Sequence, residues 1–410
     1  MTLNKIALCL SIALAGTSLV TFAEIAPSDS AKSSSSTSIA EAFLNGKTKV
    51  NLNLRYESVD QDNALEDADA LTLRTRLTYT TGDVAGFSSV IEFEDSRTVL
   101  GMDDYNNTLG KNTDHSVIAD PETTELDQFL LQYKQESLGI KVGRQLITMD
   151  NHRFVGHVGW RQDRQTFDGI TFNYQPIKDL TLNYGYLTKR NRIFAQAKDI
   201  DSKDHLLNAG YQTALGKISA YGYLLEVDNN IENALDTFGM RFNGGTSIGE
   251  QKISYQLEYA QQSADNATTS YSADYILAEL SSSFSGVGVK MGYELLGSDD
   301  GNYGFSTPLA TLHKFNGWSD QFLSTPKEGL ADLYASVGGE VVGGKWAVIY
   351  HKFDADEASL TVDDLGSEIN AIYSNSFTKN YTAGIKFAAY SAGDTTVGKV
   401  DTNKVWLWLN

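Results

Sequence analysis

Apolar and polar residues alternate along this chain in stretches of about ten residues, from Lys47 to the last residue. The clearest stretches are residues 50–57, 71–79 and 253–259. Successive side chains of a β-strand point to opposite faces, so each stretch has one apolar and one polar face. A strand that crosses a bilayer at a tilt needs about 9 to 11 residues, whereas strands of soluble proteins are usually shorter. The pattern therefore predicts membrane-spanning strands.

The gaps between these stretches alternate between short and long, which is typical of an antiparallel barrel with tight turns on one side and long loops on the other. We predict an all-β, transmembrane, up-and-down barrel of eighteen strands, with short periplasmic turns and long extracellular loops. The predicted strands are residues 47–57, 70–81, 86–96, 125–135, 138–146, 166–174, 180–190, 204–213, 217–227, 236–243, 251–261, 271–283, 287–297, 329–338, 344–353, 367–376, 381–391 and 401–410.

Proline gives an independent check on this assignment, because it cannot donate a hydrogen bond to a strand ladder. The five prolines are Pro27, Pro121, Pro176, Pro308 and Pro326, and all of them fall in a predicted linker, loop or turn.

The N-terminal segment has the features of a secretory signal. Lys5 is followed by a mostly apolar run and by small residues up to Ala23, so we predict a signal peptide over residues 1–23. A Ser-rich linker over residues 24–46 and the barrel over residues 47–410 complete the predicted organisation. The only cysteine, Cys9, lies within the signal, so the exported chain would contain no disulfide. Export and the barrel together predict the bacterial outer membrane as the location.

The net charge of −19 argues against nucleic acid as a partner. Acidic clusters such as Asp103-Asp104, Asp299-Asp300 and residues 354–357 fall in predicted gaps. They could bind a divalent cation at the lipopolysaccharide layer, but we favour ordinary solvated loop charge. No cofactor motif stands out, and the expected partners are outer-membrane lipid, lipopolysaccharide and the barrel-assembly machinery. A homo-oligomer is left open.

A lumen enclosed by eighteen strands should hold water, and the charges that line it should decide which solutes pass. Inward-facing positions carry Arg55, Arg74 and Arg76, opposite Glu92 and Glu94, while Lys189, Arg190 and Arg192 end another strand. Arg144, Arg153, Arg161 and Arg164 lie in and beside the gap after residue 146. All twelve are predicted to line the pore or bind solute. These last four arginines could form an anion-selective constriction. Alternatively, they could pair with Asp150, Asp163, Asp168 and carboxylates of the barrel wall, and both alternatives stay open.

The same segment carries a resemblance to a known family. The run GRQLITMDNHRFVGHVGWRQDRQTFDG, together with LNLRYESVDQDN, LTLRTRLTY and IADPETTELDQ, resembles the alginate-export-type outer-membrane porin family. The resemblance covers the exported chain and is strongest over residues 47–190. It implies an eighteen-stranded barrel with a positively charged lumen for anionic solutes or polysaccharide. Arg144, Arg153, Arg161 and Arg164 match the basic residues of the motif, and Arg74 and Arg76 match its wall arginines.

These observations favour a porin for passive diffusion of small or oligomeric, anionic solutes. The alternative is a dedicated export channel for an anionic, alginate-like polysaccharide. An enzyme is disfavoured because the six histidines lie mostly in loops without a G-x-S-x-G motif. A soluble secreted β-protein is disfavoured because a dry core could not hold so many unpaired charges.

Overall fold

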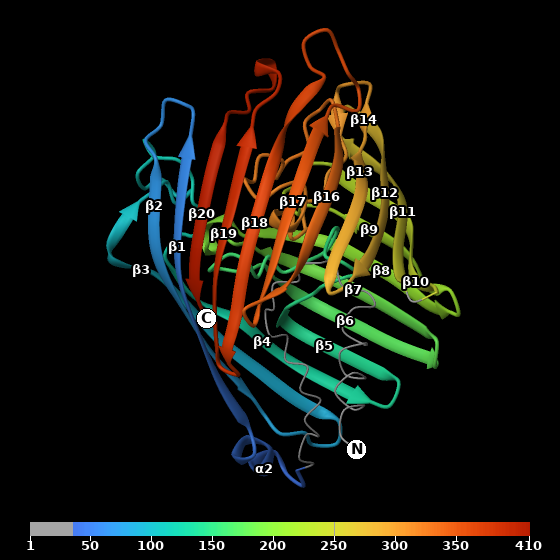
Figure 1. The fold of residues 1–410 in the computed structure, drawn as a ribbon. Helices are drawn as coiled ribbons and strands as arrows, with labels where there is room; N and C mark the ends of the chain where they lie inside the picture. The colour runs from blue at the N-terminus through green and yellow to red at the C-terminus, as the bar shows by residue number, and fades with distance from the viewer. Residues whose placement is uncertain (1–35, 250) are drawn as a thin grey trace.

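The fold is a closed antiparallel barrel, seen in a computed structural model that describes residues 36–249 and 251–410 (Figure 1). Eighteen strands form one sheet. They are β1 (Lys47–Gln61), β2 (Ala68–Thr80), β3 (Phe87–Asp104), β4 (Thr123–Gln135), β5 (Leu138–Gln145), β6 (Thr166–Ile177), β7 (Leu180–Asn191), β8 (Ile200–Thr213), β9 (Gly216–Leu225), β10 (Asn233–Ile248), β11 (Gln251–Asn266), β12 (Ser270–Phe284), β13 (Val287–Leu296), β16 (Leu330–Val341), β17 (Gly344–Asp354), β18 (Asp364–Thr378), β19 (Tyr381–Ser391) and β20 (Thr402–Leu409).

The ring closes where β1 pairs with β20, from Leu54 opposite Leu409 to Gln61 opposite Thr402. Every other strand pairs with its neighbours along the chain, so the connectivity is up-and-down. The predicted fold class is confirmed, and each of the eighteen predicted strands coincides with an observed one. The predicted signal peptide lies outside the described residues.

A short helix, α2 (Ile39–Leu44), precedes the barrel at the short-turn end (Figure 1). Ser38 caps it by accepting a hydrogen bond from the Glu41 backbone N–H at 3.2 Å. The carbonyl of Ala42 accepts from the Gly82 N–H at 2.8 Å, which ties the helix to the β2–β3 turn. Within the described residues, no helix is long and apolar enough to cross a membrane.

Several strands extend beyond the ends predicted from alternation. β3 continues to Asp104 instead of residue 96, and β8 begins at Ile200 instead of residue 204. The extensions lie toward the long loops, where a strand can continue in water without an apolar face. One expectation about proline is wrong: Pro176 lies inside β6. The β6–β7 register shifts between Tyr174 and Ile177, so this irregular strand end tolerates a residue without an N–H.

The wall has an apolar exterior and a polar interior. On β11, Leu257 and Tyr259 are about half exposed, whereas Glu258 and Ala260 between and after them are buried. This is the inverse of a soluble protein, because the exposed apolar side chains meet lipid. The alternation seen in the sequence therefore divides lipid-facing from lumen-facing positions.

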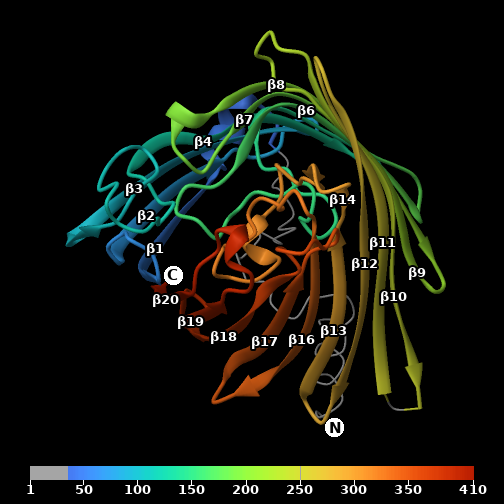
Figure 2. The ribbon, with the colours of Figure 1, turned by 90° about the horizontal axis from the view of Figure 1, so that it is seen from above.

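Two long connections fold into the ring instead of standing above it (Figure 2). The first inward loop, residues 146–165, joins β5 to β6; the second, residues 297–329, joins β13 to β16 and contains the small hairpin β14 (Ser298–Asp299) and β15 (Tyr303–Gly304) and the turn η2 (Leu312–Lys314). Phe154 of the first loop and Phe305 of the second pack with Tyr275 of the wall. The two loops therefore fill part of the lumen. The number of strands predicts a wide lumen but not this filling.

Replacing Leu257 by Arg should lower the free energy of unfolding by about 2 to 4 kcal/mol, because the charge would face the hydrocarbon layer. Ile248→Arg is the matched control, since Ile248 is also exposed but ends β10 at the rim; its cost should stay within about 1 kcal/mol. Urea titration in lipid vesicles measures both. Equal costs would mean that Leu257 does not face lipid.

Candidate functional site

The two inward loops lie against each other inside the ring. The Gly156 N–H donates to the Leu309 carbonyl at 2.8 Å, and Gln165 Nε2 donates to the carbonyls of Gly156 and Leu309. Gly156 is required here, because a Cβ would lie 2.2 Å from Thr311 Oγ1. The loops therefore form one unit that narrows the lumen.

Arg161 connects this unit to the strands where the ring closes. Its guanidinium lies 3.0 Å from Glu57 of β1 and 3.1 Å from Asp320 of the second loop. Asp320 in turn lies 3.2 Å from Lys404 of β20. Arg55 of β1 completes the group by pairing with Asp120 and donating to the Trp160 carbonyl. Ion pairs thus run from the first strand through both loops to the last strand.

Arg164 holds the end of the first loop to another part of the wall. It lies between Glu92 of β3 and Asp127 of β4, with a separation of 2.5 Å from Asp127. Nearby, Arg76 of β2 pairs with Glu94, directly opposite on β3. These charges are buried, so each depends on its partner to offset the loss of hydration.

Arg153 holds the middle of the first loop. It lies 2.8 Å from Glu294 of β13 and donates to Asn316 Oδ1 of the second loop at 3.0 Å. Asn316 donates in turn to Glu294 at 2.8 Å and to Asp332 of β16 at 3.1 Å. One buried network therefore joins both loops to two strands.

A fully buried lysine, Lys386 of β19, is surrounded by aromatic rings. Its Nζ lies 3.9 Å from the Trp318 ring centre and 4.3 Å from that of Trp160, one ring from each inward loop. Burial lowers the pKa of His313 to about 3, so the ring is neutral. Its Nε2 then accepts from Lys386 at 2.6 Å, while Nδ1–H donates to Asp320 at 2.6 Å. Cation–π contacts thus add to the attachment of the loops.

The remaining predicted residues have separate positions. Arg74 donates to Asn51 at 2.8 Å inside the lumen, and Arg190 pairs with Asp204 at 2.6 Å. Arg192 lies beyond the end of β7, with its guanidinium 4.8 Å from the Phe194 ring centre. In the part of the chain that the structure covers, Arg192 forms no ion pair.

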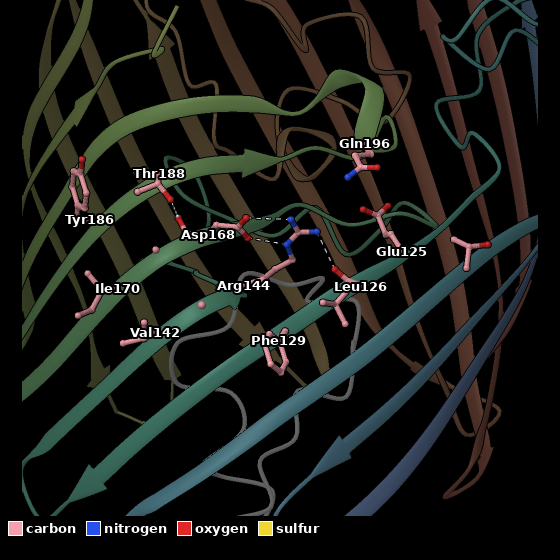
Figure 3. Close-up of a pocket in the computed structure, with 13 residues that line it drawn as sticks. Glu125, Leu126, Phe129, Val142, Arg144, Asp168, Ile170, Tyr186, Thr188 and Gln196 are labelled. Carbon is pink, nitrogen blue, oxygen red and sulfur yellow. Dashed lines mark hydrogen bonds and ion pairs between the residues drawn. The ribbon is translucent and has the colours of Figure 1, made fainter.

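Two predicted residues do not line the lumen. Arg144 stands opposite Phe129 and Asp168 and two residues after exposed Val142, which places it on the outward face of β5. Lys189 stands opposite Asp168 on the same face, because a register shift in β7 follows Leu187. The expected pore-lining position is wrong for both. Arg144 lies instead beside a cavity of about 940 Å³ and bonds Asp168 at 2.8 Å (Figure 3).

The interior is nearly balanced in charge. The buried basic residues are Arg55, Arg74, Arg76, Arg153, Arg161, Arg164, Arg190, Arg241, Lys386 and Lys404. The buried acidic residues are Glu57, Glu92, Glu94, Asp120, Asp127, Asp163, Asp204, Glu258, Glu294, Asp332 and Glu368. The sequence left open whether the arginines after residue 146 form an anion-selective constriction or pair with carboxylates. Arg153, Arg161 and Arg164 pair with carboxylates of the wall. Asp150 instead binds Asn208, Ser219 and Lys217.

Sequence reasoning missed the second inward loop and its residues. Lys314, which this loop carries, donates to the Asn151 carbonyl at 2.9 Å and has no carboxylate within ion-pairing distance among the described residues. Burial and the charges of Arg241 and Lys290 lower its pKa to about 8. The dense mixture of aromatic and polar residues over 312–322 was the available signal.

The acidic clusters considered for a divalent cation have protein partners. Asp103 pairs with Lys111 at 2.5 Å, and Asp299 accepts from the Ser272 N–H at 3.0 Å. No group of three or more His, Cys, Asp or Glu with metal-binding geometry occurs in residues 36–249 and 251–410. A loop-bound cation stays a prediction.

Comparison with known proteins identifies the family. Residues 47–299, more than half of the chain, match the profile described as alginate export. The chain belongs to the alginate export family. The predicted family is therefore confirmed, and the barrel places this member in the bacterial outer membrane.

Solved structures share the fold of this family member at low sequence identity. OccK9 (OpdG) of Pseudomonas aeruginosa superposes with a TM-score of 0.70 at 14% identity, covering 90% of this chain and 98% of that one. OccAB4 of Acinetobacter baumannii gives 0.71 at 14% identity, with 89% and 97% covered. OpdK of Pseudomonas aeruginosa, crystallised with vanillate, gives 0.70 at 12% identity, with 90% and 98% covered. No curated protein matches the chain.

Replacing Arg153 by Met should lower the free energy of unfolding by about 3 to 5 kcal/mol, because the Glu294 carboxylate would remain buried without its ion-pair partner. Arg97→Met is the control, since the Arg97–Asp95 pair is exposed and should contribute less than about 1 kcal/mol. Adding Glu294→Leu to Arg153→Met should recover part of the loss. Urea unfolding followed by tryptophan fluorescence gives the free energy of unfolding of each variant. A double variant no more stable than Arg153→Met would contradict the stabilising role of the Arg153–Glu294 ion pair.

Asp163 should make the attachment of the first loop depend on pH. Burial, with the charges of Glu125 and Glu94, raises its pKa well above the ordinary 3.8. The folded loop therefore keeps this proton at pH values where the unfolded chain loses it. Stability should fall as pH rises between the two pKa values, with a one-proton slope of about 1.4 kcal/mol per pH unit.

The variant Asp163→Asn should remove this part of the pH dependence while keeping an acceptor for the Ala195 N–H, which lies 3.0 Å from Asp163 Oδ2. Urea midpoints from pH 4 upward give the comparison. Identical pH profiles for wild type and Asp163→Asn would contradict the assignment.

Proposed function

We propose that this protein is an outer-membrane porin for passive diffusion of small solutes, with a preference for anions that carry a carboxylate. The observation that carries the proposal is the pair of inward loops, which narrow a wide barrel and are attached to its wall by buried ion pairs. A narrowed lumen lined by charged side chains favours the passage of small solutes over that of large ones.

The preference for anions rests on basic groups that form no ion pair with a carboxylate among the described residues. Lys314 is held inside the lumen by the second loop, and Arg192 lies near the long-loop end, stacked on Phe194. The more deeply buried Arg153, Arg161 and Arg164 are paired with carboxylates, and their charges hold the loops. OpdK, whose structure contains vanillate, an aromatic carboxylate, supports the same class of solute.

The second candidate is export of an anionic polysaccharide, which the family description favours. A polymer chain needs a continuous wide passage, and here the two loops would have to leave the lumen first. Their many ion pairs with the wall favour the small-solute porin. Block of single-channel current by uronic-acid oligomers, without block by small carboxylates, would favour export.

Purified protein in planar bilayers should show anion preference that falls as pH rises through about 8, because Lys314 then loses its charge. Lys314→Gln should have lower anion preference at pH 6 and little further change up to pH 9.5. Lys203→Gln, which changes an exposed lysine on β8, is the control and should behave as wild type. Reversal potentials in a salt gradient measure the preference. Lys314→Gln indistinguishable from wild type at pH 6 would overturn the role of this lysine.

A further inference from the structure

The barrel wall has a gap beside the short strand β5. The β4–β5 pairing ends where Phe129 faces Arg144, and β5 stops at Gln145 because the chain turns into the lumen as the first inward loop. β4 continues for six more residues, 123–128, which are paired in the described sheet with β3 alone. This segment of β4 therefore presents an open hydrogen-bonding edge in the wall. We call the space beside it the β4–β6 notch.

An open strand edge is not stable against hydrocarbon, because each unpaired backbone group costs several kcal/mol there. The chain satisfies part of this edge with a side chain. Arg144 Nη1 donates to the Leu126 carbonyl at 3.0 Å, while its other nitrogens bond Asp168 at 2.8 and 3.1 Å (Figure 3). The preceding residue, Gly143, has a φ of +118°, and a Cβ there would lie 2.3 Å from the Phe129 carbonyl oxygen. Only glycine therefore allows this close approach of β5 to β4.

The cavity in the notch has two kinds of lining. Phe129, Val142 and Ile170 form an apolar floor that is continuous with the lipid-facing surface, where Phe129 and Val142 are about half exposed. The polar groups gather toward the long-loop end. They are Thr124, Glu125, Arg144, Asp168, Thr188 and Gln196.

We propose that the β4–β6 notch binds an outer-leaflet glycolipid. An acyl chain would lie along the apolar floor, and the hydroxyl and amide groups of the sugar head would bond the open β4 edge and the Arg144–Asp168 pair. The occupant follows from the position of the cavity, which opens on the lipid-facing surface at the end of the barrel that bears the long loops. Arg144 is already paired with Asp168, so neutral hydrogen-bonding groups fit this site better than a phosphate alone. The proposal does not depend on which solute the lumen passes.

The test uses purified full-length protein in detergent micelles, with lipid A or dioleoylphosphatidylethanolamine as the added probe. Lipid A at saturating concentration should raise the melting midpoint of wild type by several degrees, on the order of 5 °C. Val142→Trp, which fills the cavity, should lose more than half of this shift. Leu207→Trp is the matched control, since Leu207 is a similarly exposed outward residue on β8; it should keep the full shift.

Equal shifts in all three proteins would mean that lipid A acts only as surrounding solvent, and would overturn the proposal. An equal shift with the phospholipid would assign the cavity to acyl chains alone and would overturn the glycolipid head site. If Val142→Trp does not assemble, Ile170→Trp fills the same cavity from β6 and takes its place. Native mass spectrometry of wild type should also retain lipid A in preference to the phospholipid, and the absence of any preference would count against the site.

Discussion

The whole structure depends on one constraint, that backbone N–H and C=O groups exposed to lipid must find partners within the protein. A sheet meets this constraint only when its first and last strands pair. The β1–β20 ladder, which joins residues about 350 positions apart in the sequence, supplies that closure. The alternation of lipid-facing and lumen-facing side chains follows directly, since a closed wall has one dry side and one wet side. At the β4–β6 notch the pairing of β4 with β5 ends early, and there the Arg144 side chain bonds a carbonyl of the open edge.

Closure also creates an interior that can hold charge. Arg153, Arg161 and Arg164 are buried with carboxylates from the wall. In a packed protein core such pairs often contribute little net stability, because desolvation offsets attraction. Here they have a geometric role, since they fix two long loops inside a space too wide for wall side chains to fill. The arginines that the sequence suggested for solute selection are thus used to build the constriction. The proposed preference for anions depends instead on Lys314 and Arg192.

Strand positions were predictable because the membrane imposes a two-residue period that any register must obey. Local irregularities were not, because they depend on pairing between strands. Pro176 is tolerated by a register shift, and a shift in β7 places Lys189 on the outward face. Contacts between distant segments were also hidden: Arg161 could be recognised as a loop arginine, but its partner Asp320 lies 159 residues away on a loop with no recognisable motif. The sequence therefore identified the charged residues, whereas their ion-pair partners are determined by the tertiary structure.

The ion pairs that run from Glu57 through Arg161 and Asp320 to Lys404 cross the junction of the first and last strands. A nascent sheet that is still open there cannot complete this chain of contacts, so the loops gain their full attachment only after the ends meet. Closure of the ring and attachment of the constriction are therefore coupled through these contacts.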